Sequence, residues 1–174
     1  MGSMHQADLL TDAARRPVDS AKAVLADISA ETLHAMPGGS NSIAWLVWHA
    51  ARQQDAQISH LSGEAQVWEA GWEERLGVAR GADDIGFGDT PEEVAALRIV
   101  EPSELLAYLE AVVSAVVAYV IPLDAAALGE VVDHNWDPPV TRGVRVISTI
   151  DDAVAHVAQA AYARGVVEGW RVGY

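Results

Sequence analysis

Apolar residues recur along most of the chain at the spacing of a helix rather than that of a strand. The first amphipathic stretch runs from about Gln6 to Ile28, and Pro17 within it is expected to kink or restart the helix. Glycine and proline gather at a few junctions, such as Pro37–Gly39 and Pro138–Pro139. The pattern therefore divides the chain into helices that are separated by well-marked breaks.

The second helical stretch contains the most apolar part of the chain. Ser40–Ser42 offers N-cap residues for a helix that reaches about Leu61, and Gly63 is expected to end it. Its expected inward positions are Ile43, Leu46, Val47, Ala50, Gln54, Gln57, Ile58 and Leu61. The connection over residues 63–88 is rich in tryptophan and glycine, and one short helix is expected near residues 69–76.

Two further helix starts are marked by proline. Thr90–Glu93 reads TPEE, a capping box with proline at the first helical position, and predicts a short helix through about Ile99. Pro102 or Ser103 begins a third long helix, which Pro122 ends. Its expected inward residues are Leu105, Leu106, Leu109, Val112, Val113, Val116, Val117 and Val120.

The last helix is expected from about Thr141 to Trp170. Its expected inward residues are Val144, Ile147, Ile150, Val154, Val157, Ala161 and Val166. Four long helices with a long connection between the second and the third predict an all-α four-helix bundle. We expect one domain over residues 1–174, with residues 1–4 as an added or disordered leader outside the bundle.

Charge and composition narrow the possible functions. The chain has 11 Lys+Arg against 25 Asp+Glu, a formal net charge of −14, and Lys22 is its single lysine. Such an acidic chain repels phosphate backbones and anionic lipids, so we expect no nucleic-acid partner and no membrane partner. Cysteine is absent, which excludes disulfides, thiolate zinc sites and a cysteine nucleophile. With neither a signal peptide nor an apolar run of about 18 residues, a cytoplasmic protein is expected.

Three polar residues lie on otherwise apolar helical faces. His49 lies in the most apolar part of the second helix, where a neutral imidazole could bind a metal or act as a base. On the last helix, Asp152 and His156 are one turn apart, so the carboxylate could orient the ring. The structural alternatives are a core histidine that is satisfied by a carbonyl and an ordinary ion pair on a helix surface. Spacing alone does not decide whether His49 and His156 meet.

Other candidates are weaker. Trp45 and Trp48 cannot share one narrow stripe of a helix, so at least one is expected to meet a connection, a partner chain or a ligand. His134 lies in a polar loop that two prolines stiffen, and a stiff crossover is its simplest role. The sequence lacks a phosphate-binding loop, a Gly-x-Ser-x-Gly elbow and a His-x-x-x-His pair. The Glu-x-x-His ligand pattern is missing at both inward histidines, because Leu46 stands three residues before His49 and Ala153 three before His156.

Two segments resemble a known family. Residues 42–55 read SIAWLVWHAARQQD, which is similar to the second helix of the DinB-like (DinB/YfiT) superfamily, and Tyr162–Gly165 resembles the end of its last helix. WDPPVTRGVR and HVAQAAYARG, at residues 136–145 and 156–165, resemble an uncharacterised actinobacterial branch. The resemblance implies a bundle of up-down-down-up order, often dimeric, in a superfamily of metal-dependent thiol S-transferases and related hydrolases or isomerases, some of which use mycothiol.

The resemblance also implies a metal triad, which this chain retains only in part. His49 matches the first ligand, whereas the other two positions, counted back from Arg164–Gly165, are Gln159 and Ala163. Two of three histidine ligands are therefore replaced, one of them by a residue without a donor atom. A looser set of His49, His156 and Gln159 is the alternative arrangement for zinc or nickel.

Two functions follow as hypotheses. The first is a small-molecule enzyme that resembles thiol S-transferases, with His49 as metal ligand or base and His156, oriented by Asp152, as its partner. The second is a non-catalytic ligand-binding or stress-related bundle that has lost its metal. The candidate ligand-binding residues are Trp45, Trp48, Gln159, Tyr162 and Arg164. A homodimer is expected from the resemblance, and any thiol must come with the substrate.

Overall fold

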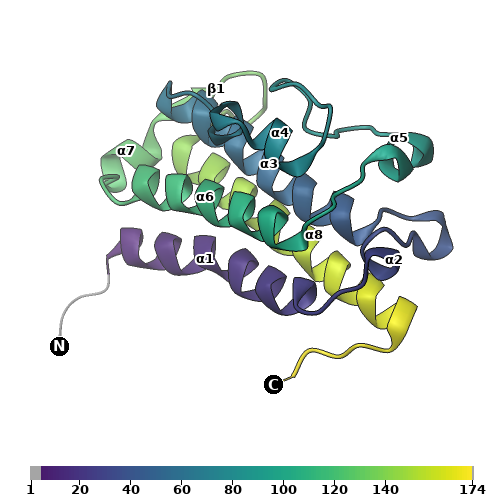
Figure 1. Cartoon of the computed structure of the whole chain (residues 1–174). Helices are drawn as coiled ribbons and strands as arrows, with labels where there is room; N and C mark the ends of the chain where they lie inside the picture. Colours follow the sequence, from purple (N-terminus) through teal and green to yellow (C-terminus); the bar gives the residue numbers. More distant parts are fainter. Residues whose placement is uncertain (1–4, 174) are drawn as a thin grey trace.

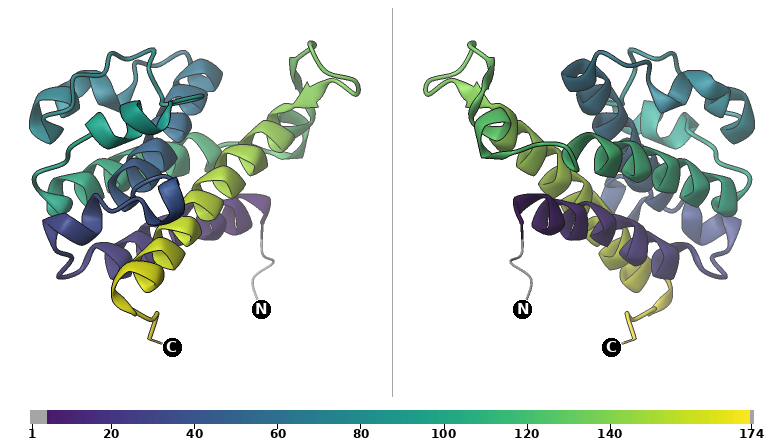
Figure 2. Two further views of the ribbon diagram at one scale, coloured as in Figure 1. Left: turned by 90° about the vertical axis from the view of Figure 1, so that its right-hand side faces the viewer. Right: turned by 90° about the vertical axis from the view of Figure 1, so that its left-hand side faces the viewer.

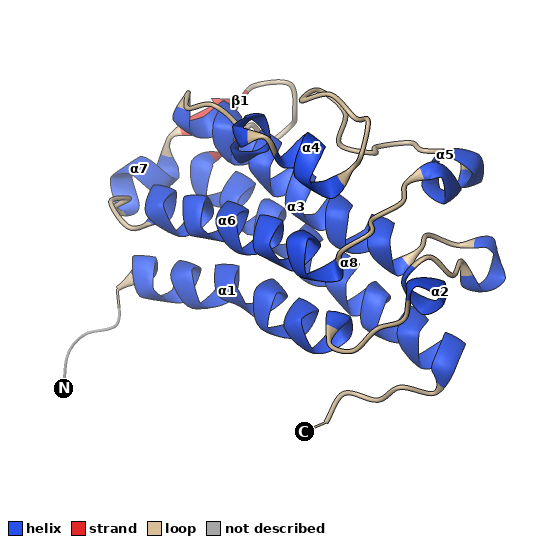
Figure 3. Cartoon of the chain, in the orientation of Figure 1, coloured by secondary structure: helices blue, strands red, loops and turns tan. Residues whose placement is uncertain are grey.

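The computed structural model describes residues 5–173, and over these residues the chain is mostly helical (Figures 1 and 3). The expected leader at residues 1–4 lies outside the described residues. Four long helices share one core: α1 (Gln6–Leu25), α3 (Ile43–Ser62), α6 (Pro102–Val120) and α8 (Arg142–Glu168). Helix α3 packs against both α6 and α8, and α1 packs against the same two helices.

Shorter elements occupy the connections. Between α1 and α3 lie α2 (Ala30–Leu33) and η1 (Pro37–Gly39), and between α3 and α6 lie η2 (Val67–Ala70), α4 (Trp72–Leu76) and α5 (Pro91–Ala96). Helix α7 (Ala125–Gly129) and the strands β1 (Val131–Asp133) and β2 (Val140–Thr141) precede α8. The strands pair antiparallel, with Val131 opposite Thr141 and Asp133 opposite Val140. The apolar pattern did not predict α2, η1, α7 or this hairpin.

The predicted caps form at the expected residues. Ser42 accepts a hydrogen bond from the Trp45 amide at the start of α3, and Gly63 ends that helix with φ of 76°. Thr90 and Glu93 form the capping box of α5. Helix α1 runs through Pro17 as one element and ends at Leu25, so a restart at the proline was wrong.

The inward face of α8 differs from the prediction. Ile150 and Val157 are buried, but Val144, Ile147, Val154 and Val166 are 57, 52, 39 and 55% exposed. The buried face instead carries Val146, Thr149, Ala153, Ala160, Ala163 and Arg164. Because apolar and small residues surround this helix on most sides, their periodicity did not distinguish the core face from the outer one.

A buried polar cluster joins α3 to the connection that follows it. Arg52 is fully buried, and its Nη1 donates to Asp55 (3.3 Å) and to the Tyr108 hydroxyl (3.1 Å). Asp55 also accepts from the amides of Val67 and Trp68, at 2.7 and 2.8 Å. Burial, together with the nearby charge of Asp55, raises the pKa of Tyr108 and keeps it protonated as a donor.

Helix α6 is unusually apolar, and helix α8 is unusually long. Helix α6 is long and apolar enough to cross a membrane, but eight of its residues are buried in the core. The core helices of proteins without a membrane span can have the same length and hydropathy.

Helix α8 has 27 residues, so its first turns and the β1–β2 hairpin project beyond the other long helices (Figure 2).

Candidate metal centre

His49 is fixed by contacts on two sides. It lies in the first half of α3 and is 6% exposed. Its Nδ1 is 2.5 Å from the carbonyl of Ile85, and its ring stacks on Trp45 with centroids 4.7 Å apart and planes 5° apart. Since Nδ1 donates to the carbonyl, Nε2 is left as the lone-pair nitrogen that a metal or a proton requires.

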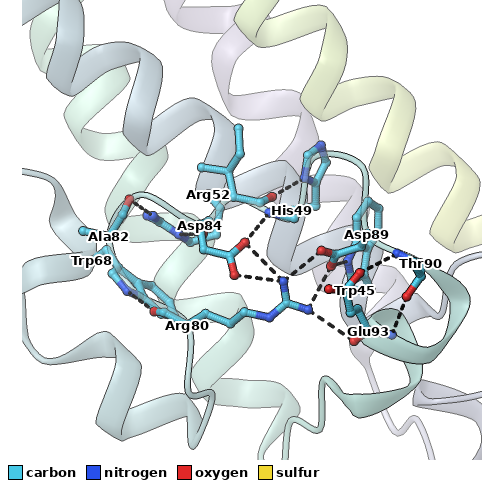
Figure 4. Close-up of polar contacts among 12 residues, drawn as sticks. Trp45, His49, Arg52, Trp68, Arg80, Ala82, Asp84, Asp89, Thr90 and Glu93 are labelled. Carbon is cyan, nitrogen blue, oxygen red and sulfur yellow. Dashed lines mark hydrogen bonds and ion pairs between the residues drawn. The ribbon is translucent and has the colours of Figure 1, made fainter.

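The segment that supplies the Ile85 carbonyl is held by Arg80 (Figure 4). Arg80 pairs with Asp84 (3.1 Å) and Asp89 (2.9 Å), and Asp89 accepts from the indole nitrogen of Trp45 at 2.8 Å. Arg52 donates to the carbonyls of Ala82 (2.7 Å) and Asp84 (3.4 Å) in the same segment. The sequence did not predict this support, because it depends on long-range side-chain pairs and on backbone carbonyls that carry no sequence signal.

The second histidine comes from α8. His156 Nδ1 lies 2.8 Å from the carbonyl of Asp152, and the rings of His49 and His156 have centroids 4.6 Å apart. Helices α3 and α8 run antiparallel here, because Gln53 donates to the Thr149 carbonyl at 2.9 Å while His49 faces His156. The structure therefore brings together two predicted residues that are 107 positions apart in the sequence.

Asp152 completes a group of three possible ligands. Its Oδ2 is shielded from solvent and lies 3.3 Å from His156 Nδ1, which is its one polar contact among the described residues. His49, Asp152 and His156 each offer one ligand atom, and the three atoms lie within 4.8 Å of one another. In a tetrahedral zinc site, bonds of about 2.1 Å place neighbouring donor atoms roughly 3.4 Å apart, so the three side chains would move closer by about 1 Å to share one ion. A solvent-shielded carboxylate oxygen beside two imidazoles is a donor set that fits a divalent metal.

The two histidines differ in their electrostatic surroundings. Burial, and to a smaller extent the charge of His156, lowers the pKa of His49 below the usual value, although the Ile85 carbonyl opposes the shift. Burial also disfavours protonation of His156, but the hydrogen bonds and charge of Asp152 raise its pKa overall. His49 is therefore the neutral imidazole near neutral pH, and His156 is the one that holds a proton more readily.

The other predicted residues lie in different surroundings. Gln159, Tyr162 and Ala163 line a separate cavity of about 470 Å³, together with Leu46 and the segment around η1. Trp48 is fully buried, with its ring edge-on to Trp68. Arg164 donates to the carbonyls of Val24 and Ala26 at 2.8 Å, so it caps the end of α1.

A smaller cavity of about 180 Å³ adjoins the candidate ligands. Its walls are formed by His49, Gln53, Gln57, Ile85, Phe87, Arg145, Ser148, Thr149 and Asp152. Sequence reasoning did not select Gln53, Phe87 or Arg145. The only available signal was that Arg145 lies on the same side of α8 as Asp152, seven residues away.

Comparisons with known proteins show the family to which the chain belongs. A model of the DinB superfamily matches residues 13–160, so the chain belongs to the DinB superfamily. The crystal structure of a conserved protein from Enterococcus faecalis is 35% identical in sequence, with a TM-score of 0.89 over 97% of this chain and 100% of that one. No curated protein matches the chain.

Proposed function

We propose that the protein is a metal-dependent enzyme that acts on a small molecule, with thiol transfer or a related reaction as its chemistry. His49, Asp152 and His156 hold one divalent ion, zinc or nickel. The observation that carries the proposal is the convergence of three ligand atoms from two helices, all within 4.8 Å of one another. Three protein ligands with an open position are typical of catalytic zinc sites.

The roles of the residues follow from their contacts. A bound divalent ion would lower the pKa of a thiol or water placed on it, which favours the nucleophilic form. The Ile85 carbonyl and the Trp45 ring hold the His49 imidazole in one orientation. His156 keeps its Nδ1 proton on the Asp152 carbonyl, so its Nε2 is available. The chain contains no cysteine, so the reacting thiol belongs to the substrate.

Metal titration tests this proposal directly. Chelator-treated protein is titrated with zinc against a chromophoric chelator, and the bound metal is counted by elemental analysis. We expect one ion per chain for the wild type and losses of more than about 100-fold in affinity for His49→Ala and His156→Ala, because each removes a direct ligand. The exposed His60→Ala is the matched control. No binding at micromolar zinc, or equal binding by all variants, contradicts the metal centre.

The alternative function is a ligand-binding or stress-related bundle without catalysis. It is favoured by Gln159 and Ala163, which occupy the two positions where the superfamily resemblance implies histidines. Zinc-loaded protein that consumes no thiol in the presence of an electrophile, while still binding small molecules, supports this alternative over the enzyme.

Several finer features belong to the same proposal. We propose an up-down-down-up order of the long helices, membership of an actinobacterial branch, use of mycothiol as the thiol, a cytoplasmic location and a homodimer. The homodimer is supported by the exposed apolar residues of α8, whose burial by a second copy would remove them from water.

A further inference from the structure

The cavity beside the candidate metal ligands contains a cation that the proposed metal chemistry does not use. Arg145 and Asp152 both line this space, and Gln53, Gln57 and Ser148 add neutral polar groups between them. A volume of about 180 Å³ is smaller than the roughly 300–1,000 Å³ of pockets that take drug-sized ligands. The space therefore suits a small metabolite with a polar end.

Arg145 retains donors that the protein does not use. Its Nη2 pairs with Asp133 of β1 at 2.6 Å, and its side chain is 24% exposed. A guanidinium carries five N–H donors in a planar fork. Among the described residues, Nε and Nη1 of Arg145 have no hydrogen-bond partner. A planar carboxylate matches such a fork in geometry and in charge.

The position of Arg145 sets the orientation of a ligand in the cavity. Arg145 precedes Asp152 by seven residues, which is close to two helical turns, so both lie on the same side of α8, about 10.5 Å apart along the axis. A short ligand can thus place an anionic end near Arg145 and its other end near His49 and Asp152. In a chain with a net charge of −14, an anion needs such a local cation to bind at all.

We propose that this cavity binds a small carboxylic acid, whose carboxylate is held by Arg145 and whose other end faces His49 and Asp152. The proposal gives the substrate class of the metal centre proposed above. Binding of the carboxylate to Arg145 does not depend on that proposed function, whereas a reaction at the ligand's other end, near His49 and Asp152, does. Arg145 is then the residue that determines specificity for an acid over a neutral molecule.

Binding of short monocarboxylates tests the proposal. Butyrate and 4-hydroxybutyrate are titrated by calorimetry into metal-free and zinc-loaded protein, with the neutral butyramide as the matched probe. We expect butyrate or 4-hydroxybutyrate to bind at millimolar concentration or better, and butyramide to bind at least tenfold more weakly. Arg145→Gln should weaken acid binding at least tenfold, whereas the exposed Arg98→Gln should leave it unchanged.

Asp133→Asn separates ligand binding from a purely structural role. If Arg145 only holds the hairpin to α8, then Asp133→Asn and Arg145→Gln should lose binding and thermal stability together. If Arg145 binds the carboxylate, Asp133→Asn should bind the acid as tightly as the wild type or more tightly, because it removes a competing negative charge.

The outcomes also separate this proposal from the metal centre. Failure of both acids in both forms of the protein, or equal binding of butyrate and butyramide, overturns the carboxylate site even if zinc binds. Acid binding that depends on Arg145 in a protein that takes no zinc supports the carboxylate site and contradicts the metal proposal. If the acid binds more tightly to zinc-loaded protein than to metal-free protein, the result supports both the carboxylate site and the metal centre.

Discussion

At the scale of single residues, Arg52 is the most costly side chain to bury. It is fully buried, and its charge is balanced by Asp55 and by hydrogen bonds to Tyr108, Gln66 and two backbone carbonyls. A buried ion pair contributes little net stability by itself, but removal of one partner leaves the other charge uncompensated. Arg52 therefore links α3, through hydrogen bonds, to Tyr108 of α6 and to the connection that supports His49.

Arg52→Met should destabilise the fold by about 3–5 kcal/mol, because Asp55 would remain buried without its cation. Urea unfolding followed by tryptophan fluorescence measures this change. The control is Arg16→Met, which removes an exposed ion pair with Asp12 and should cost less than about 1 kcal/mol. A loss of similar size in the two variants would show that the buried network is not the source of the stability.

At the scale of elements, the segment between α4 and α5 depends on the charge of Asp89. Burial alone would raise the pKa of this carboxyl, but the hydrogen bonds from Arg80 and Trp45 lower it overall. The folded pKa thus lies below the unfolded value of about 3.9. The ionised form stabilises the fold fully above that unfolded value, and the contribution is lost as pH falls through the lower folded pKa.

Acid should therefore release this segment before the core unfolds, and the Asp89→Asn variant should show the released state at neutral pH. Loss of the charge-assisted hydrogen bonds should cost about 1.5–3 kcal/mol. Trp45 fluorescence and limited proteolysis within residues 77–90 report the opening as pH decreases. Asp83→Asn, an exposed neighbour, serves as the control. A segment that stays closed through the acid titration would show that Asp89 does not hold it.

The sequence predicted where helices begin and end better than it predicted which residues and backbone atoms surround the candidate site. Helix starts at Ser42 and Thr90 were predictable because capping is a local interaction between residues three positions apart. His49, His156 and Asp152 were predictable because each is a polar residue on an apolar helix. The Ile85 carbonyl and Arg145 were not, since one is a backbone atom and the other is an ordinary helix arginine until the cavity is known.

The inward face of α8 was predicted wrongly because it, too, depends on long-range contacts. A helix with valine, isoleucine or alanine on most sides gives no strong amphipathic direction. The structure selects the face through long-range contacts, for example the bond from Gln53 of α3 to the Thr149 carbonyl. The residues left outside form an exposed apolar strip on α8: Val144, Ile147, Val154, Tyr162 and Val166.

At the scale of the whole molecule, the exposed apolar strip and the net charge act in opposite directions on self-association. Burial of the strip in a homodimer is favoured at about 25 cal/mol per Å² of apolar surface. Two copies that each carry −14 repel one another, and salt weakens the repulsion as the Debye length falls from about 10 Å at 0.1 M to about 3 Å at 1 M. The proposed dimer should therefore become more stable as salt is added.

Sedimentation equilibrium at several salt concentrations measures this balance. We expect the wild type to shift toward twice the monomer mass with rising salt, because the apolar contact remains while the repulsion is screened. The double variant Ile147→Glu, Val154→Glu should stay monomeric under all conditions, since it places two charges in the centre of the strip. Val100→Glu adds a charge at another exposed valine and should dimerise nearly as the wild type does. A wild type that remains monomeric at high salt, or a double variant that dimerises normally, would exclude α8 as the contact surface.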